Sequence, residues 1–344
     1  MKNKITIFSV ILLSTLFFII SCNKEIIPND NNTNSNIKVV KLITLTSGYK
    51  TSITMLEFSD TNAYDSILSD LYQQVETHED AFIAQYDSLN DSLLNAKEEE
   101  IGYNDQQPLI DFENSLGFTN SMRQVYDVDV EDWLNHDTLD SITDPDNTYV
   151  FDIEEMAMLN TGGEVKIGTA ILKLTNEGFI EFTDGDVNKL ARFNSGDMTV
   201  LNEPNVITSL TENSRSSNCK WWKGKNIWDK YASKRKVKKH LHFHAYPWKG
   251  TSSVRITSYK KRGRRWKRYR MYMGVQNTSE FYDRNDCDNK IFQEASIWRR
   301  KKKKTIRKHC TGWGAFPGYR AKNWFSVVGQ FEYSGKYNYE VLSW

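Results

Sequence analysis

Charge is divided unevenly along this chain, and the division limits how its parts can fold together. The whole sequence has a formal net charge of only +1. Between Thr51 and Asn160, however, 26 Asp and Glu residues stand against Lys97 and Arg123, a balance of −24. Between Arg215 and Lys322, 32 Lys and Arg residues stand against six acidic residues, a balance of +26. Opposite fields of this size attract, although salt screens them beyond about 8 Å. Either the two halves dock on each other, or each charge keeps an exported protein soluble and serves an outside partner.

The first 22 residues have the layout of a secretory signal. Lys2 and Lys4 precede an apolar run from Ile5 to Ile20, and Ser21 and Cys22 follow it. At about 1.5 Å per helical residue the run reaches roughly 24 Å, which is short of a hydrocarbon core of about 30 Å. The short length of the apolar run therefore favours a cleaved signal over a permanent transmembrane helix.

The end of this segment resembles the bacterial lipobox, in which an aliphatic residue, a spacer and a small residue precede a cysteine. The resemblance implies cleavage before Cys22 and lipidation of its sulfur, with palmitate as a typical chain. A protein of this kind is anchored to the cell envelope, with the outer membrane as the expected site. A plain cleaved signal peptide is the alternative.

Length and composition predict two folded domains beyond the signal. About 320 residues remain, which is more than one core usually serves. Polar stretches around Pro28 and Pro204 are too poor in apolar residues to fold, so they indicate a tether and a linker. The predicted plan is a signal peptide (1–21), a flexible tether (22–36), an acidic α+β domain (37–202), a linker (203–218) and a basic, Trp-rich β domain (219–344).

The acidic domain is predicted to mix helices and strands. Residues 37–58 alternate apolar and polar side chains around a turn signal at Ser47-Gly48, which indicates one or two strands. Apolar residues then recur at helical spacing from Ile67 to Leu93. Further helices are expected from Pro108 to Gly117, over 121–134, and from Asp152 to Gly162, and an antiparallel meander over 164–167, 170–174 and 179–182.

The basic domain is predicted to be an antiparallel sandwich or barrel. Turn signals fall at Arg262-Gly263, at 300–303 and at Ser334-Gly335. The expected strands cover 239–246, 253–260, 266–275, 289–298, 305–310, 324–333 and 336–342.

Three short motifs in the first half carry a resemblance to a known family. They are Met55-Leu56-Glu57-Phe58, the run from Phe112 to Phe118, and the run from Gly163 to Gly168. Over roughly residues 50–183 the pattern resembles a family of secreted Bacteroidota lipoproteins. The resemblance implies a shared small module and export, and it implies no activity. Where many members have Trp, this chain has Phe112.

Five tripeptides in the acidic half have the form Asp, then Ser or Thr, then an aliphatic residue. This form resembles the acceptor pattern for O-glycosylation of exported Bacteroidota proteins. The alternative is local structure, because Asp-Ser pairs also begin and cap helices. The predicted acceptor residues are Ser66, Ser88, Ser92, Thr138 and Ser141.

Three alternating histidines are the candidate metal ligands. His240, His242 and His244 share one face of a predicted strand, about 6.5 to 7 Å apart stepwise. Two of them suit zinc, and His309 and Cys310 are candidates to complete the site. The alternative is an ordinary strand whose histidines face solvent, because the intervening apolar residues would form the core face and no acidic residue lies nearby in the sequence.

Cysteine use agrees with an oxidising compartment. Beyond Cys22 the chain has Cys219, Cys287 and Cys310. The pair nearest in sequence, Cys287 and Cys310, is the candidate disulfide, and buried reduced cysteines are the alternative.

Two dense cationic clusters with interleaved aromatic residues are the candidate polyanion site. Both are expected at neighbouring hairpin turns, where they would form one cationic rim able to bind anionic polymers and stack on flat rings. The alternative is that the lysines only protect sheet edges while Trp fills the core. The site residues are Lys260, Lys261, Arg262, Arg264, Arg265, Trp266, Lys267, Arg268, Arg270, Arg299, Arg300, Lys301, Lys302, Lys303 and Lys304.

These observations predict a membrane-anchored envelope lipoprotein whose β domain binds polyanions. Suitable partners are acidic polysaccharide, lipopolysaccharide phosphates or extracellular DNA, and not cytosolic nucleic acid. No phosphate loop, nucleophile elbow or zinc-protease helix motif occurs, so no cofactor or catalytic residue is assigned. The alternatives are a metal-dependent enzyme that uses the His240 strand, and a structural or partner-binding envelope protein.

Overall fold

The described part of the chain begins with a six-stranded sheet. The computed structural model describes residues 36–344 except 47–48, 137–138, 140–142, 211–221, 276, 284–289, 296–298, 314–318, 334–335 and 344. Of the one or two strands predicted over 37–58, two are present: β1 (Ile37–Thr46) and β2 (Tyr49–Phe58), which pair antiparallel. β2 then pairs in parallel with β3 (Glu164–Ile167), and the predicted meander is formed by β3, β4 (Ala170–Thr175) and β5 (Gly178–Phe182). A further strand, β6 (Val206–Thr208), pairs antiparallel with β5. β6 lies within the stretch predicted as a linker.

Helices occupy the segment between β2 and β3. Polar caps begin them as expected: the Asp60 side chain accepts a hydrogen bond from the Ala63 amide at 2.8 Å, and Ser121 caps the fourth of these helices. Gly117 ends another with a left-handed φ of 65°. The helices are α2 (Thr61–Gln85), α3 (Asp91–Glu100), α4 (Gln107–Leu116), α5 (Met122–Asn135), the 3-10 turn η2 (Pro145–Asn147) and α6 (Ile153–Met158), with α7 (Val187–Asn194) and η3 (Met198–Asn202) after β5. The helix predicted to run to Gly162 ends at Met158.

Two antiparallel sheets form the basic region. The first has the order β10-β9-β8-β7, with β15 paired to β9, and the second has the order β13-β12-β16-β11-β14, with β17 paired to β16. Both orders end at edge strands, so of the two predicted architectures the sheets match a sandwich. The strands are β7 (Trp222–Ala232), β8 (Arg235–Ala245), β9 (Lys249–Arg262), β10 (Arg265–Arg268), β11 (Met271–Val275), β12 (Thr278–Asp283), β13 (Lys290–Ala295), β14 (Arg299–Lys303), β15 (Thr305–Trp313), β16 (Tyr319–Tyr333) and β17 (Lys336–Ser343).

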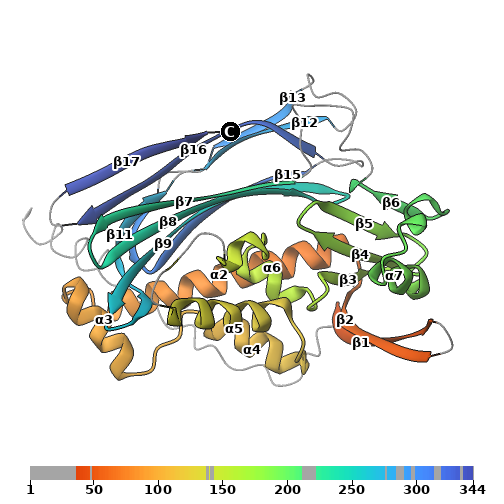
Figure 1. The fold of residues 1–344 in the computed structure, drawn as a ribbon, viewed down its shortest axis with the longest axis horizontal. Helices are drawn as coiled ribbons and strands as arrows, with labels where there is room; N and C mark the ends of the chain where they lie inside the picture. Colours follow the sequence, from red (N-terminus) through yellow and green to blue (C-terminus); the bar gives the residue numbers. More distant parts are fainter. Residues whose placement is uncertain are drawn as a thin grey trace, which may run out of the picture. The chain divides into compact units, whose positions relative to one another are not determined.

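The β8–β9 sheet is covered on both faces. β16 of the second sheet packs against β8 and β9, while helices α2, α5 and α6 lie on the opposite side (Figure 1). One apolar cluster contains Leu68 and Met156 from the helical segment together with Leu241, Ile256 and Met273 from the basic sheets. The prediction of an α+β region followed by an antiparallel β region is confirmed.

Two details of the predicted strands are wrong. The turn expected over 300–303 is strand β14, which pairs with β11. The single strand expected over 266–275 is divided into β10 and β11, which belong to different sheets. The Asn95 side chain of α3 serves the backbone at this break, because it accepts a hydrogen bond from the Arg270 amide at 2.9 Å and donates one to the Arg270 carbonyl at 3.1 Å.

Among the helices of the described residues, none combines the length and the apolar composition that crossing a membrane requires.

Candidate metal centre

Strand β8 presents its three histidines to the helices. In an antiparallel strand alternate side chains share a face, so Lys238, His240, His242 and His244 point one way. All four are at most 3% exposed. The prediction that the histidines face solvent is therefore wrong. The physical reason is that the helical segment covers this face, while the second sheet covers the face carrying Leu241 and Phe243.

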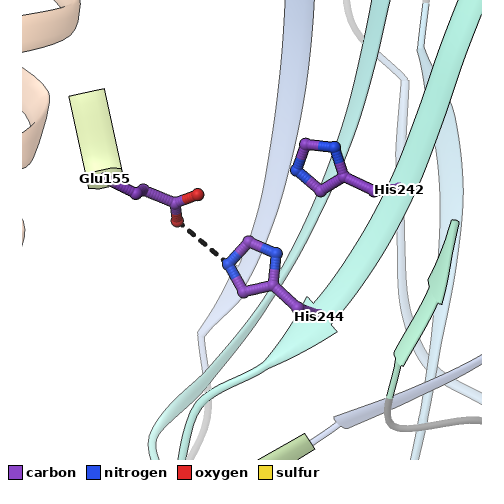
Figure 2. A group of neighbouring side chains, drawn as sticks. All are labelled: Glu155, His242 and His244. Carbon is purple, nitrogen blue, oxygen red and sulfur yellow. Dashed lines mark hydrogen bonds and ion pairs between the residues drawn. The ribbon is translucent and has the colours of Figure 1, made fainter. Parts of the chain in front are cut away.

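Helix α6 brings a carboxylate to these histidines. Asp152 caps the helix and Glu155 stands at its third position, where one of its oxygens accepts a hydrogen bond from the Asp152 amide at 3.0 Å. The other oxygen, Oε1, lies 3.0 Å from His244 Nε2 and accepts a hydrogen bond from the Tyr246 hydroxyl at 2.8 Å. Figure 2 shows Glu155 opposite the His242 and His244 rings. A helix cap thus doubles as the acidic member of the site.

Glu155, His242 and His244 can share one metal ion. Each offers one ligand atom, and these atoms all lie within 4.8 Å of one another. Two ligands on a tetrahedral zinc ion at 2.0–2.1 Å lie about 3.3 Å apart, so the 3.0 Å contact between Glu155 and His244 already matches and the His242 ring needs a modest shift. His242 Nε2 is buried and has no hydrogen-bond partner among the described residues, which is costly for a polar atom unless something else satisfies it. His244 Nδ1 has no such partner either, but it lies on the side of the ring away from the Nε2 that contacts Glu155.

The protonation states suit metal ligation. Burial lowers the pKa of His242 to about 4, so its ring is neutral at pH 7. Burial alone would raise the pKa of Glu155, but His244 and Lys249 outweigh it and hold that pKa at about 2. Glu155 therefore offers a carboxylate and His242 a neutral imidazole, which are forms that bind zinc.

His240 orients the site without belonging to the trio. Its Nε2 lies 3.1 Å from His242 Nδ1, which directs the other nitrogen of His242 toward the helices. Burial lowers the pKa of His240 well below its usual value, with Arg255 adding to the effect. Such a contact to a ligand's second nitrogen is the usual way of fixing its tautomer.

Neighbouring cations are neutralised by acidic residues of the helical segment. Lys238 contacts Asp144 at 2.8 Å and also Asp146, and Arg255 contacts Asp146 at 2.7 Å. Lys249 contacts Asp65 at 2.5 Å. These ion pairs compensate the positive charge of Lys238 beside the histidines.

His309 and Cys310, the other two candidate ligands, have described backbones but no described side chains. His309 pairs in register with Ser253, and Ser253 pairs with His242 on the next strand. The side chains of His309 and Cys310 are not among those described, and neither are Cys219 and Cys287. The disulfide prediction for Cys287 and Cys310 therefore stays a prediction.

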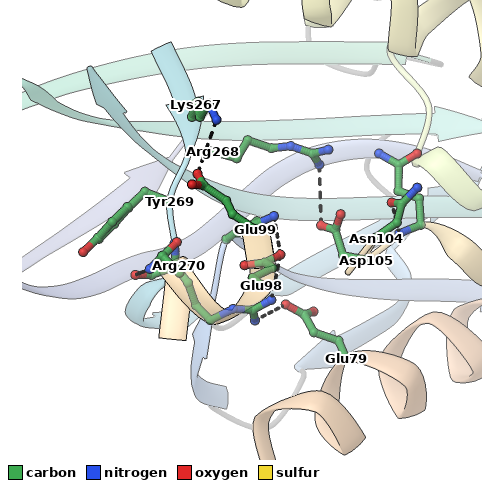
Figure 3. Close-up of polar contacts among 12 residues, drawn as sticks. Glu79, Glu98, Glu99, Asn104, Asp105, Lys267, Arg268, Tyr269 and Arg270 are labelled. Carbon is green, nitrogen blue, oxygen red and sulfur yellow. Dashed lines mark hydrogen bonds and ion pairs between the residues drawn. The ribbon is translucent and has the colours of Figure 1, made fainter. Parts of the chain in front are cut away.

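The cationic clusters meet the acidic helices. Arg270 contacts Glu79 at 2.7 Å and Glu98 at 3.5 Å, and Lys303 contacts the same Glu79 at 2.9 Å. Lys304 also contacts Glu98, and Arg268 lies 3.7 Å from Asp105 (Figure 3). The structure thus joins the two clusters through shared carboxylates and supports docking of the acidic half on the basic half. The side chains of Arg299, Arg300, Lys301 and Lys302 lie outside the description.

Trp266, proposed as part of an aromatic rim, is a core residue. It is 6% exposed and packs with Trp133, Leu139 and Tyr259. Tyr269 is similarly buried at 5%, and Trp298 lies outside the described residues. Stacking of a ligand ring on Trp266 is therefore excluded, because the tryptophan belongs to the contact between β10 and α5.

The predicted glycosylation acceptors on the helical segment are accessible. Ser66 on α2, Ser88 after it and Ser92 on α3 are exposed. Thr138 and Ser141, like Cys22, lie outside the described residues. Exposure permits modification and does not test it.

Sequence reasoning missed Glu155 as a ligand. Asp152 and Glu155 have capping-box spacing, and that spacing correctly marked a helix start. Nothing in it indicates a partner 89 residues further along the chain. The only signal in the sequence was the capping-box spacing itself, which marks Glu155 as a residue with a structural role.

Comparisons with known proteins leave the family open. No family model matches the chain, and no curated protein matches it. Among solved structures, a DUF4848 family protein from Bacteroides thetaiotaomicron is similar, with 13% identity over 88% of this chain and 100% of that chain, at a TM-score of 0.19. The name of that family assigns it no function. At this TM-score the likeness supports no conclusion about fold or function.

Proposed function

We propose that this protein is an envelope lipoprotein that binds one divalent transition-metal ion of the zinc class between Glu155, His242 and His244. The observation that carries the proposal is the buried Nε2 of His242, which has no hydrogen-bond partner among the described residues and lies beside the contact of the ionised Glu155 carboxylate with His244. Imidazole and carboxylate together suit zinc and its neighbours better than magnesium or calcium, which take oxygen ligands.

The role of the ion is structural in this proposal. The three side chains are at most 2% exposed, so they offer no open position for a substrate. The Tyr246 hydroxyl donates a hydrogen bond to Glu155 Oε1 at 2.8 Å and would hold this carboxylate in place behind the ion. An ion held here would join α6 of the acidic region to β8 of the basic region. This argues against the metal-dependent enzyme considered as an alternative.

Metal retention tests the proposal. Purified protein is loaded with zinc, dialysed against metal-free buffer and analysed for metal, and the expected content is about one ion per chain. His242→Ala and Glu155→Gln should lose the ion, while His136→Ala, which removes an exposed histidine, should retain it. Loading with Co²⁺ should produce the visible absorption of a low-coordinate nitrogen and oxygen site. Circular dichroism shows whether each variant is folded.

Two results would overturn the metal proposal. One is folded wild-type protein that retains no metal after dialysis. The other is His242→Ala protein that retains as much metal as His136→Ala protein, because the ion would then sit elsewhere.

The envelope location is a separate part of the proposal and is supported by the lipobox resemblance at Cys22. Cys22→Ser should leave the protein unlipidated and move it from the membrane fraction to the soluble fraction. Intact-mass measurement on protein from its native host also tests glycosylation of Ser66, Ser88 and Ser92, because each glycan adds hexose-sized increments to the mass. A mass equal to the lipidated polypeptide would exclude the glycans.

A further inference from the structure

The hairpin between β9 and β10 differs from the other cationic segments in its exposure. Gly263 adopts a φ of 62° at its turn, which favours glycine, and lets the two strands reverse tightly. Around it, Arg262, Arg264, Arg265 and Lys267 are all exposed. Arg270 and Lys303, in contrast, are buried and form ion pairs with Glu79. Among the described side chains of the two cationic clusters, the exposed cations are therefore concentrated at this hairpin.

The carboxylate of Glu99 already contacts the cations of this hairpin. Arg262 Nη1 donates to both oxygens of Glu99 at 2.8 Å, and Lys267 Nζ lies 3.3 Å from Oε1. These side chains are 37%, 47% and 53% exposed, so water and competing anions reach the contact. Exposed ion pairs of this kind contribute little stability and are exchangeable. The neighbouring Glu98, at 4% exposure, is by contrast a buried part of the fold.

A cleft of about 510 Å³ lies beside this contact. Its lining combines α3, through Glu98 and Glu99, with Arg265 and Lys267 of β10 and with Lys304. Figure 3 shows Glu99 reaching from α3 to Lys267. The volume is in the range that holds one or two sugar-sized units.

We propose that the β9–β10 hairpin binds a carboxylated polysaccharide, and that Glu99 occupies the position of one ligand carboxylate until the polymer displaces it. The geometry supports a carboxylate because Arg262 and Lys267 already hold one. A polymer is favoured over a single anion because four exposed cations in six residues attract linked charges through counterion release. Single-stranded nucleic acid is disfavoured because the aromatic residues that line the cleft, Trp266 and Tyr103, already use their ring faces inside the protein. Trp266 is 6% exposed with Lys236 and Lys261 over its ring, and Tyr103 stacks on His78 and Phe82.

Binding of fluorescent alginate oligomers to the full chain tests the surface. The wild-type affinity should fall steeply as salt rises from about 50 to 200 mM. Arg264→Ala/Arg265→Ala should weaken binding and reduce the salt slope by roughly 0.7 to 0.9 per charge removed. Lys38→Ala/Lys41→Ala removes the same charge from β1 and should leave binding unchanged, since Lys38 and Lys41 lie on a different sheet. Equal losses in the two double variants would overturn the proposal, as would an absence of binding.

Two adjacent glutamates of α3 test the displacement. Glu99→Gln should raise the affinity for alginate by up to about fivefold, because Arg262 and Lys267 no longer have to leave a charged partner. Glu100→Gln removes the same charge from the next residue, whose partner is Lys97, and should change affinity less. Equal effects of the two substitutions would show that Glu99 does not occupy the site. Stronger binding of single-stranded DNA than of alginate would overturn the assignment to polysaccharide.

Discussion

The two faces of strand β8 are both buried, yet they are built from opposite chemistry. Leu241 and Phe243 point into an apolar cluster shared with the second sheet, whereas His242 and His244 meet acidic residues on the helical side. The apolar face gains stability from any well-packed hydrocarbon. The polar face is stable only if every charge finds its partner, because an unpaired buried charge costs several kcal/mol. The comparison shows how a basic strand can be buried once an acidic segment supplies the counter-charges.

The largest expected effect comes from removing one shared counter-charge on the polar face. Asp146 contacts both Lys238 and Arg255, so Asp146→Ala takes away the carboxylate that Arg255 contacts and leaves Lys238 with Asp144 alone. We expect the free energy of unfolding to fall by about 3–5 kcal/mol. Denaturant titration measures it.

A matched substitution at an exposed pair provides the control. Asp184 contacts Lys189 at 2.6 Å near the surface, and Asp184→Ala should cost far less. Similar losses at Asp146 and Asp184 would mean that the buried pairs contribute no more than surface pairs do.

Acid should lower the free energy of unfolding, because His242 on the polar face stays neutral in the folded protein. The folded protein holds the pKa of this ring at about 4, below the ordinary value of 6.5, because burial disfavours the charged ring. As pH falls from 6.5 to 4, the unfolded chain binds a proton that the folded chain does not, so stability falls. In metal-free protein this contribution is about 3 kcal/mol.

His242→Gln isolates this contribution. The variant should lose less stability than wild type between pH 6.5 and 4, whereas Phe243→Leu on the opposite face should keep the wild-type pH dependence. The measurement is denaturant unfolding at each pH with a chelator present. Parallel curves for wild type and His242→Gln would contradict the prediction.

A smaller effect is expected from the apolar face alone. Ile256 is fully buried on β9 beside Leu241 and Phe243 in the same apolar cluster. Ile256→Val removes one methylene group and should cost about 0.5–1.5 kcal/mol at every pH. A cost that depended on pH would show that the two faces are coupled through the sheet.

The smallest effect on stability is expected at the hairpin. Glu99→Gln breaks the exposed contacts to Arg262 and Lys267, and it should change the free energy of unfolding by less than about 1 kcal/mol. Thermal unfolding with and without added salt measures it. A loss as large as that of Asp146→Ala would place Glu99 in the fold rather than at a ligand-binding surface.

Much of the local structure was predictable. Strands β1 and β2 lie on either side of the turn signal at Ser47-Gly48, Ser121 and Gly117 bound helices, and Arg262-Gly263 lies at a hairpin turn. These signals are local, because a cap or turn depends on the backbone of a few neighbouring residues. The break at Arg270 was missed because its backbone partner is Asn95, 175 residues earlier in the chain.

The sequence by itself determined that histidine and apolar side chains alternate along β8. It also determined that the chain has an acidic half and a basic half whose charges attract each other. Only the tertiary structure decided that the histidine face is buried and that Glu155 meets it. Alternation places side chains on two faces but cannot say what covers each face. That depends on α6, whose capping glutamate reaches His244 only after the acidic segment has packed on the basic sheet.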